Sequence, residues 1–388
     1  MATTQIAGTN DDRFARVREV FTQHFSDGAE IGAAVAVTVG GEPVVDLWGG
    51  VADPESGRAW ERDTLVNVFS TTKAMTALCA LRLYELGQLD LDAPVASYWP
   101  EFAAAGKEAI PVRSLLNHQA GLAAVRKPLD GPVLFDWDAI TSALAAETPW
   151  WNPGTAHGYH ALTFGWLVGE VVRRVSGKSL GRFFADEFAT PLGLDFHIGL
   201  DPSLDSRVAT MGGLSMEPAP GEPSLAEIIL GDSESVSAKA FTNPVSLMLP
   251  ETVNSRAWRG AEIPGANGHS DARSLARIYG ALAGNGMCDG VDVLSNEVRD
   301  LARCVESDGE DLVLRVPTRF GLGFMLHHEG MPLGPNPGAF GHPGAGGSLG
   351  FADPDAGVGF GYVMNRMGPH ILLDPRPRAL IAAVYESL

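Results

Sequence analysis

A serine and a lysine three residues apart could form a nucleophile and its base. Ser70 and Lys73 lie in the segment Phe69-Ser70-Thr71-Thr72-Lys73-Ala74-Met75, where a helix is expected to begin. Residues at i and i+3 share a helix face, so the lysine amine can approach the serine hydroxyl. A buried lysine with a lowered pKa can activate that hydroxyl, and a helix N-terminus favours the negative charge that follows. A serine that caps a helix, followed by a surface lysine, gives the same short pattern. Other parts of the chain are therefore needed to distinguish a catalytic pair from an ordinary helix start.

Four further segments make the pattern more specific. They are, in chain order, Leu89-Asp90-Leu91-Asp92-Ala93-Pro94-Val95, Val112 to Leu122, Trp151-Asn152-Pro153-Gly154 before Tyr159, and the glycine turn and helix of Gly265 to Arg277. Together with S-x-x-K they resemble the serine β-lactamase and penicillin-binding protein superfamily, over residues 10 to 388.

The resemblance implies that Tyr159 is a second catalytic residue, sharing the role of general base with Lys73. Its phenol would accept the serine proton and return it to the leaving group. The sequence continues through His160 to Ala161, where many class C β-lactamases carry Y-x-N. Ala161 lacks the amide that helps to hold the side chain of a β-lactam, which disfavours an antibiotic as the substrate.

The third motif of the superfamily, K-T-G on an edge strand, is replaced here by His342-Pro343-Gly344. The resemblance implies that Gly344 permits close backbone approach and that the backbone N–H groups of Ala345 and Ser70 form an oxyanion hole. Loss of the Lys and Thr removes groups that bind a carboxylate. This form resembles the family VIII carboxylesterases, which predicts a serine carboxylesterase acting on small neutral esters without a cofactor.

Several aromatic residues flank these motifs, and some are expected to line an apolar pocket for the acyl or alcohol group. They are Trp150, Trp151, Phe241, Trp258 and Phe340. We assign substrate contacts to Trp151, Phe340, His342 and Gly344. Alternatives are a β-lactamase or amide hydrolase of the same fold, or a catalytically silent penicillin-binding-like sensor.

A second serine motif competes with Ser70. Gly346-Gly347-Ser348-Leu349-Gly350 fits G-x-S-x-G, the nucleophile elbow of α/β-hydrolases, which needs a strand before the serine and a helix after it. An Asp-Pro-Asp-Ala-Gly turn and another strand follow Ser348 instead. Ser348 is therefore assigned to a Gly-rich strand.

The elements that would position these residues come from both ends of the chain. Strands are expected at Gly32–Val39 and Pro43–Trp48, joined by Gly40-Gly41, and at Phe320–His328, Gly347–Ala352 and Val358–Asn365. The predicted fold is α+β and β-lactamase/DD-peptidase-like, with an antiparallel sheet flanked by helices and a mostly helical second domain. The sheet domain is expected to comprise residues 1–80 and 265–388, and the helical insert residues 81–264.

Apolar periodicity and capping residues predict the helices. They are expected at Asp11–Phe25, Thr71–Leu86, Val112–Asn117, Trp137–Glu147, Thr163–Ser176, Leu180–Ala189, Ser270–Gly284 and Arg376–Leu388. Residues 201–264 are rich in Pro, Gly, Ser and Glu, and are expected to form long loops with one short helix near Leu225–Leu230.

Composition sets broader limits. Asp and Glu outnumber Lys and Arg by 47 to 28, a net charge of −19, which argues against nucleic acid or an anionic membrane as partner. Three scattered cysteines and the spacing of the histidines suggest neither a disulfide framework nor a metal site. The N-terminal residues resemble no signal peptide and no segment is long enough to span a membrane, so a cytoplasmic location is expected. The oligomeric state is left open.

Overall fold

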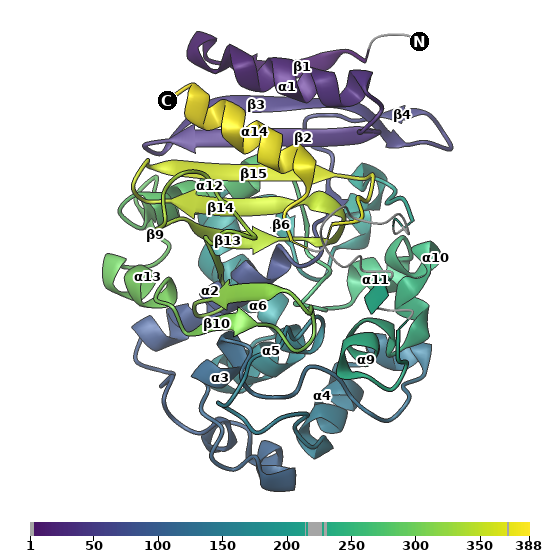
Figure 1. Cartoon of the computed structure of the whole chain (residues 1–388), viewed down its shortest axis with the longest axis vertical. Coiled ribbons are helices and arrows are strands. Elements are labelled where there is room, and N and C mark those ends of the chain that lie inside the picture. Colours follow the sequence, from purple (N-terminus) through teal and green to yellow (C-terminus); the bar gives the residue numbers. More distant parts are fainter. Residues whose placement is uncertain (1–3, 214, 216–226, 229–230, 371) are drawn as a thin grey trace.

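An antiparallel sheet built from both ends of the chain dominates the computed structural model, which describes residues 4–213, 215, 227–228, 231–370 and 372–388 (Figure 1). Within these residues the sheet has ten strands, in the order β1-β3-β2-β15-β14-β13-β12-β11-β10, with β4 paired to β3. The strands are β1 Ile6–Asn10, β2 Gly32–Val39, β3 Glu42–Asp53, β4 Arg58–Ala59, β10 Ser307–Glu310, β11 Pro317–Phe320, β12 Met325–Leu326, β13 Phe340–Pro343, β14 Leu349–Asp353 and β15 Val358–Met364. The two chain ends meet where β2 pairs with β15, from Ala33 opposite Met364 to Val39 opposite Val358.

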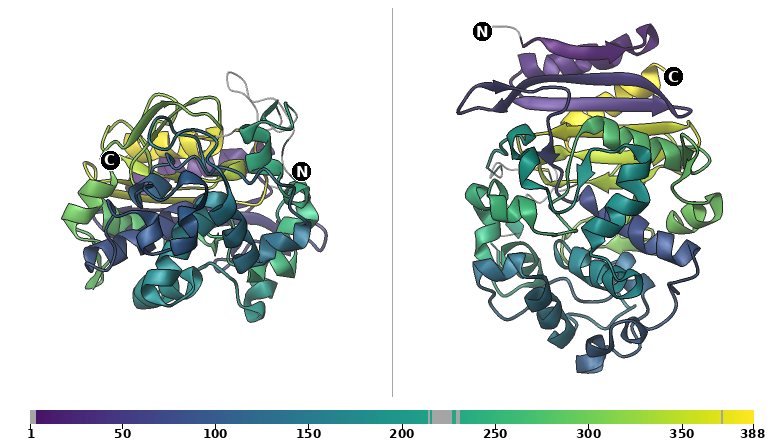
Figure 2. Two further views of the ribbon diagram at one scale, coloured as in Figure 1. Left: turned by 90° about the horizontal axis from the view of Figure 1, so that it is seen from below. Right: turned by 180° about the vertical axis from the view of Figure 1, so that it is seen from behind.

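Helices cover both faces of this sheet. The N-terminal helix α1 (Ala15–Ser26) and the C-terminal helix α14 (Pro375–Glu386) pack together on one face, and α12 (Ala272–Ala283) covers the other (Figures 1 and 2). Because both faces are covered, seven of the eight residues of β2 are buried. The predicted antiparallel sheet with flanking helices is therefore confirmed.

Helix α2 (Thr72–Glu85) lies between the sheet and a helical layer. It contacts β13 on one side and α5 (Thr163–Ser176) on another, and its residues from Thr72 to Leu81 are all buried. A helix that is enclosed in this way has no solvent face, so it carries apolar residues all round. The remaining helices of this layer include α3 (Arg113–Leu116), α4 (Trp137–Ala146) and α6 (Leu180–Phe184).

Helix boundaries expected from capping residues agree with the structure. Helix α12 begins after Asp271, whose carboxylate accepts a hydrogen bond from the Ser274 N–H at 2.7 Å. Helix α5 spans the expected residues and ends at Gly177, which has a left-handed backbone. The π-helical turn Ala185–Ala189 follows α6 and extends it over the range expected for one helix.

Two expectations were wrong. The strand expected at Phe320–His328 is broken, because the chain turns between β11 and β12 and those strands pair with each other. Residues 201–264 contain several short helices where long loops were expected. They are η6 (Pro202–Arg207), α9 (Val236–Thr242), η7 (Val245–Met248), α10 (Pro250–Val253) and α11 (Arg256–Gly260). Helices of four to seven residues are too short to give a clear apolar period.

The short helix expected at Leu225–Leu230 lies largely outside the described residues. The division into residues 1–80 with 265–388 and residues 81–264 stays a prediction.

Candidate active site

Ser70 lies in the turn that leads into α2, and the backbone just before it is strained. The preceding residue, Phe69, has a φ of +43°, which a non-glycine residue rarely adopts. Hydrogen bonds hold this turn in place, since the Thr72 N–H donates to the Phe69 carbonyl at 3.0 Å and the Lys73 N–H donates to the Ser70 carbonyl at 2.9 Å. The hydroxyl of Ser70 therefore has a fixed position at the start of the enclosed helix.

The Lys73 amine lies 3.1 Å from the Ser70 hydroxyl oxygen, as the i, i+3 spacing predicts. It also donates to the backbone carbonyls of Ala161 at 2.6 Å and Gly265 at 2.7 Å. The side chain is fully buried, and among the described residues no carboxylate forms an ion pair with it. Burial without a counter-charge lowers the pKa of Lys73 well below its ordinary value. A neutral amine uses its two N–H groups on the two carbonyls, which leaves its lone pair for the Ser70 hydroxyl.

Tyr159 approaches the same serine from the loop before α5. Its side chain lines a cavity together with Ser70, and Lys73 Nζ lies 4.7 Å from the centre of its ring. Burial raises the pKa of Tyr159 above its ordinary value, although the nearby Ser70 hydroxyl opposes the shift. Tyr159 is therefore a neutral phenol that can donate a proton.

A buried carboxylate holds the backbone of Tyr159. Asp311 Oδ1 accepts from the N–H groups of Tyr159 at 3.0 Å, Val313 at 2.8 Å and Leu314 at 2.9 Å. Its other oxygen accepts from the Thr318 hydroxyl at 3.1 Å. The role of Asp311 could not be predicted from the sequence, because no local pattern links it to Tyr159, which lies on a distant loop.

Three histidines near this serine are buried and neutral. Burial lowers the pKa of His160 and of His342 to about 3, and lowers that of His118 well below its ordinary value. His160 donates from Nδ1 to the Gly158 carbonyl at 2.8 Å and accepts at Nε2 from the Leu122 N–H at 3.0 Å. These rings add no positive charge around Lys73, because burial keeps them in their neutral state.

His342 and Ala345 lie on the sheet side of Ser70. His342 faces Tyr159, with ring centres 6.0 Å apart, and its Nδ1 lies 2.7 Å from the Pro343 carbonyl. Strand β13 is not at the sheet edge, since β12 pairs with its first half at Phe340 and Gly341. The second half of β13 has no partner from β12, and the chain turns directly after it. In this turn Ala345 lines the cavity next to Ser70.

Gly344 permits a close backbone approach, as expected, but the approach is to the segment before α2, and its contact with substrate stays a prediction. A Cβ atom at this position would collide with the Ser348 hydroxyl oxygen and the Val68 carbonyl oxygen. The glycine therefore allows the sheet to pack against the segment before α2, and it does not line the space beside Ser70.

Ser348 is a structural residue. Its side chain is buried, and its hydroxyl donates to the Val68 carbonyl at 2.8 Å and lies 3.2 Å from the Thr71 hydroxyl. It stands just before β14, and no helix follows it. The G-x-S-x-G pattern is therefore not a nucleophile elbow in this fold.

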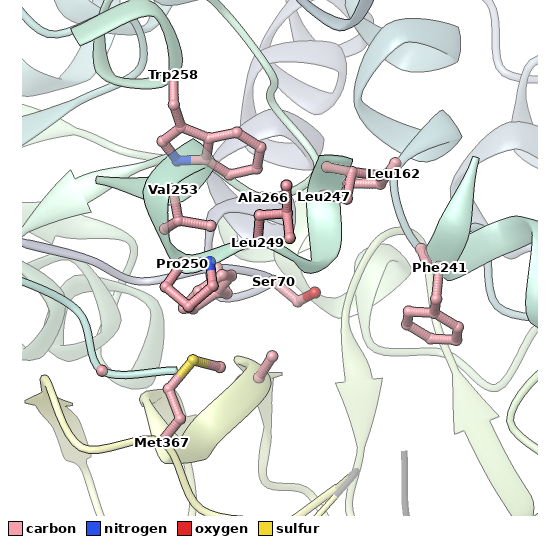
Figure 3. A pocket seen from close by; sticks show the side chains of 14 residues that line it. Ser70, Leu162, Phe241, Leu247, Leu249, Pro250, Val253, Trp258, Ala266 and Met367 are labelled. Atoms are coloured by element: carbon pink, nitrogen blue, oxygen red, sulfur yellow. The ribbon is translucent and has the colours of Figure 1, made fainter. Parts of the chain in front are cut away.

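Two cavities meet at Ser70. The Trp258 cavity has a volume of about 120 Å³, and none of the described residues that line it is charged (Figure 3). Its apolar lining includes Leu162, Phe241, Leu247, Leu249, Pro250, Val253, Trp258 and Met367. The Tyr159 cavity has a volume of about 40 Å³ and is lined by Tyr159, Leu314, Met325, His342, Gly346, Gly368 and Leu372, among others. Ser70, Phe241 and Ala345 line both.

Two residues predicted to contact the substrate lie outside both cavities, and their role stays a prediction. Phe340 is fully buried and packs edge-to-face on Phe324, with ring centres 5.2 Å apart. Trp151 packs on His160. Neither residue lines the two cavities. The apolar lining comes instead from the short helices after residue 236, which sequence analysis did not resolve, although Phe241 and Trp258 were among the candidates.

Other kinds of site are not evident in the part of the chain that the structure describes. Its residues hold no group of three or more His, Cys, Asp or Glu side chains with metal-binding geometry. None of its helices combines the length and apolar character needed to cross a membrane.

Comparisons with known proteins agree with this geometry. The Beta-lactamase family matches residues 17–384. The chain is 39% identical to Esterase/beta-lactamase LipL of Mycobacterium tuberculosis over 379 residues, which cover 95% of this chain and 85% of the relative. The structure of a family VIII carboxylesterase is 44% identical, with a TM-score of 0.91, over 99% of this chain and 100% of that one. A penicillin-binding protein homologue from Caulobacter crescentus gives the same identity, TM-score and coverage.

Proposed function

This chain belongs to the beta-lactamase family, and we propose that it is a serine carboxylesterase that hydrolyses small neutral esters through an acyl-enzyme on Ser70. One observation carries the proposal. The Ser70 hydroxyl lies 3.1 Å from a buried lysine amine that has no carboxylate partner among the described residues, beside a cavity without charged side chains. A neutral amine next to a hydroxyl is a base for acyl transfer, and an uncharged cavity favours an uncharged substrate.

In the proposed reaction Ser70 Oγ attacks the ester carbonyl carbon while its proton passes to Lys73 Nζ. The carbonyl oxygen becomes an oxyanion, stabilised by the N–H groups of Ser70 and Ala345. When the ester C–O bond breaks, the neutral phenol of Tyr159 donates its proton to the departing alkoxide, and the Lys73 ammonium restores it. Water then attacks the acyl-enzyme by the same relay. The products are the carboxylic acid, the alcohol and the free serine.

This assignment refines the role predicted for Tyr159. A tyrosine whose pKa is raised by burial is a poor base at neutral pH but keeps the proton that an acid must donate. Lys73, whose pKa is lowered, is the better base. We therefore give the two roles to different residues instead of sharing them.

The two cavities suggest how the ester lies. The departing alkoxide must be close to its proton donor, and Tyr159 lines only the smaller cavity. The alcohol group is therefore assigned to the Tyr159 cavity and the acyl group to the Trp258 cavity. The preferred substrate has an apolar acyl group and a compact alcohol.

The reaction type is tested by comparing p-nitrophenyl butyrate with a chromogenic cephalosporin. We expect turnover of the ester, and strong turnover of only the cephalosporin would favour a β-lactamase. A fluorophosphonate inhibitor followed by peptide mass analysis should place the adduct on Ser70, with Ser348→Ala as the matched control that still reacts. No adduct would favour a catalytically silent sensor, and an adduct on Ser348 would overturn the mechanism.

The orientation is tested by filling each cavity in turn. Val253→Phe in the Trp258 cavity should lower kcat/KM for p-nitrophenyl octanoate about tenfold and leave the acetate almost unchanged. Leu314→Phe in the Tyr159 cavity should instead lower kcat/KM for cyclohexyl butyrate and leave that for methyl butyrate almost unchanged. The opposite pattern would reverse the assignment.

A further inference from the structure

The turn that carries Ala345 consists mostly of glycine. Gly346 has a φ of +83° and Gly347 a φ of +126°, conformations that glycine adopts at little cost. Glycine also loses more conformational freedom than other residues when it is ordered. Within the turn, the Gly347 N–H donates to the Gly344 carbonyl at 3.0 Å. The position of the Ala345 N–H therefore depends on contacts from outside the turn.

A buried arginine supplies such a contact. Arg376, in the first turn of α14, donates from Nη2 to the Gly346 carbonyl oxygen at 2.6 Å. The Gly368 N–H donates to the same oxygen at 2.9 Å, and Arg376 Nη1 donates to the Arg366 carbonyl at 3.0 Å. The guanidinium thus joins the glycine turn to the segment after β15. Gly346 and Gly368 both line the Tyr159 cavity.

Carboxylates fix Arg376 itself. Asp374 accepts from Nε at 2.8 Å and from Nη2 at 3.1 Å, which is a bidentate pair, and Glu30 accepts from Nη1 at 3.1 Å. The Tyr362 hydroxyl also donates to Glu30. The side chains of Arg376 and Glu30 are 8% and 0% exposed. A planar guanidinium with all three nitrogens engaged has one orientation, so it can define the position of the carbonyl that it holds.

We propose that Arg376 is a positioning residue for the oxyanion hole, because by holding the Gly346 carbonyl it fixes the turn that presents the Ala345 N–H beside Ser70. The inference rests on the proposed function, which gives Ala345 its role. Donors stabilise an oxyanion only when they are already oriented, and loosely held groups lose much of that effect. Arg376 acts through the turn and touches no substrate.

The test uses Arg376→Lys and Arg376→Gln with p-nitrophenyl butyrate and its thiono analogue, in which sulfur replaces the carbonyl oxygen. We expect kcat for the ester to fall about 10- to 100-fold while KM changes less than about threefold, because the lost contact acts on the transition state. Sulfur accepts hydrogen bonds poorly, so the thiono ester gains less from the oxyanion hole. The ratio of ester to thiono-ester rates should therefore fall, which a loss of stability alone would not cause.

The matched control is Arg299→Lys. Arg299 is another buried arginine that donates to a backbone carbonyl, that of Gly284, and it pairs with Asp300. We expect its kcat and its rate ratio to equal those of the wild type.

Unchanged kcat and rate ratio in folded Arg376 variants would overturn the inference. If neither variant folds, Asp374→Asn decides, since it leaves the arginine in place and removes its bidentate partner. A lowered rate ratio then supports the inference and an unchanged one overturns it. Wild-type protein that hydrolyses no ester would instead overturn the proposed function, and the inference with it.

Discussion

Two buried basic side chains lie near Ser70, and their surroundings are opposite. Lys73, on the helical side, contacts two carbonyls and a hydroxyl. Arg376, on the sheet side, contacts Asp374 and Glu30 as well as carbonyls. Burial lowers the pKa of Lys73, whereas the anionic groups around Arg376 outweigh its burial and raise the pKa of the guanidinium.

The difference shows how one fold gives two basic side chains different tasks. Without a carboxylate, the lysine can lose its proton and serve as a base. With two carboxylates, the arginine stays charged and holds backbone in place. The predictions below test whether the surroundings decide these tasks.

The largest effect is expected when Lys73 is made permanently charged. Lys73→Arg cannot release a proton under ordinary conditions, so kcat/KM for p-nitrophenyl butyrate should fall about 10³-fold. The matched control is Lys107→Arg. Lys107 is a buried lysine that also donates to three carbonyls, those of Ala104, Ala145 and Glu147. Its replacement should leave kcat/KM close to that of the wild type. Activity above a tenth of the wild-type value in folded Lys73→Arg would contradict the role of base.

For stability we expect the opposite order, with a larger loss at Arg376 than at Lys73. Arg376→Met leaves the buried Asp374 carboxylate without its bidentate partner and Glu30 without its counter-charge, and the free energy of unfolding should fall by about 3–5 kcal/mol. Lys73→Met leaves only carbonyls unpaired, and we expect a loss of about 1–3 kcal/mol. Urea unfolding at pH 7 compares the two variants. Equal losses would mean that the carboxylates around Arg376 do not distinguish the two sites.

Glu30 gives the charged cluster a pH dependence. Burial raises the pKa of Glu30 to about 7, against the opposing effects of Arg376 and Tyr362, and Asp374 raises it further. The folded state thus binds this proton more tightly than the unfolded state, so the contribution of Glu30 to stability decreases as the pH rises from about 4.5 to about 7. Glu30→Gln should remove roughly 3 kcal/mol of this decrease. Thermal unfolding at several pH values measures this dependence for both proteins. The same change in stability with pH in wild type and Glu30→Gln would contradict the prediction.

The smallest effect is expected on the helical side, at the carboxylate that holds the Tyr159 loop. Asp311→Asn keeps the shape but weakens the three amide contacts that hold the loop of Tyr159, so kcat should fall about tenfold with little change in KM. Thr318→Val, which removes the hydroxyl contacts to Asp311 and to His157 but keeps the three amide contacts, should lower kcat less than threefold. Steady-state kinetics with methyl butyrate, whose alkoxide needs a proton to leave, measure both, and equal effects would show that the carboxylate does not position Tyr159.

The helical side was the more predictable from the sequence. The contact between Ser70 and Lys73 follows from a spacing of three residues on a helix, which is local information. Tyr159 and Ala345 needed the resemblance of longer segments to a family. Arg376 was missed because its partners, Glu30 and Gly346, are distant in the chain and no local pattern joins them. Trp151 and Phe340 do not line the two cavities, because closeness to a motif in sequence does not decide which way a side chain points.

The meeting of the two chain ends in one sheet has a consequence for biosynthesis. Ser70 and Lys73 leave the ribosome before Ala345, β14, β15 and Arg376. Long-range pairing of β2 with β15 must wait for the later segments. A nascent chain that ends before Ala345 would hold its nucleophile and base without the second donor of the proposed oxyanion hole. Hydrolysis would therefore begin only after the strands β14 and β15 and the helix α14 have been made and have joined the sheet.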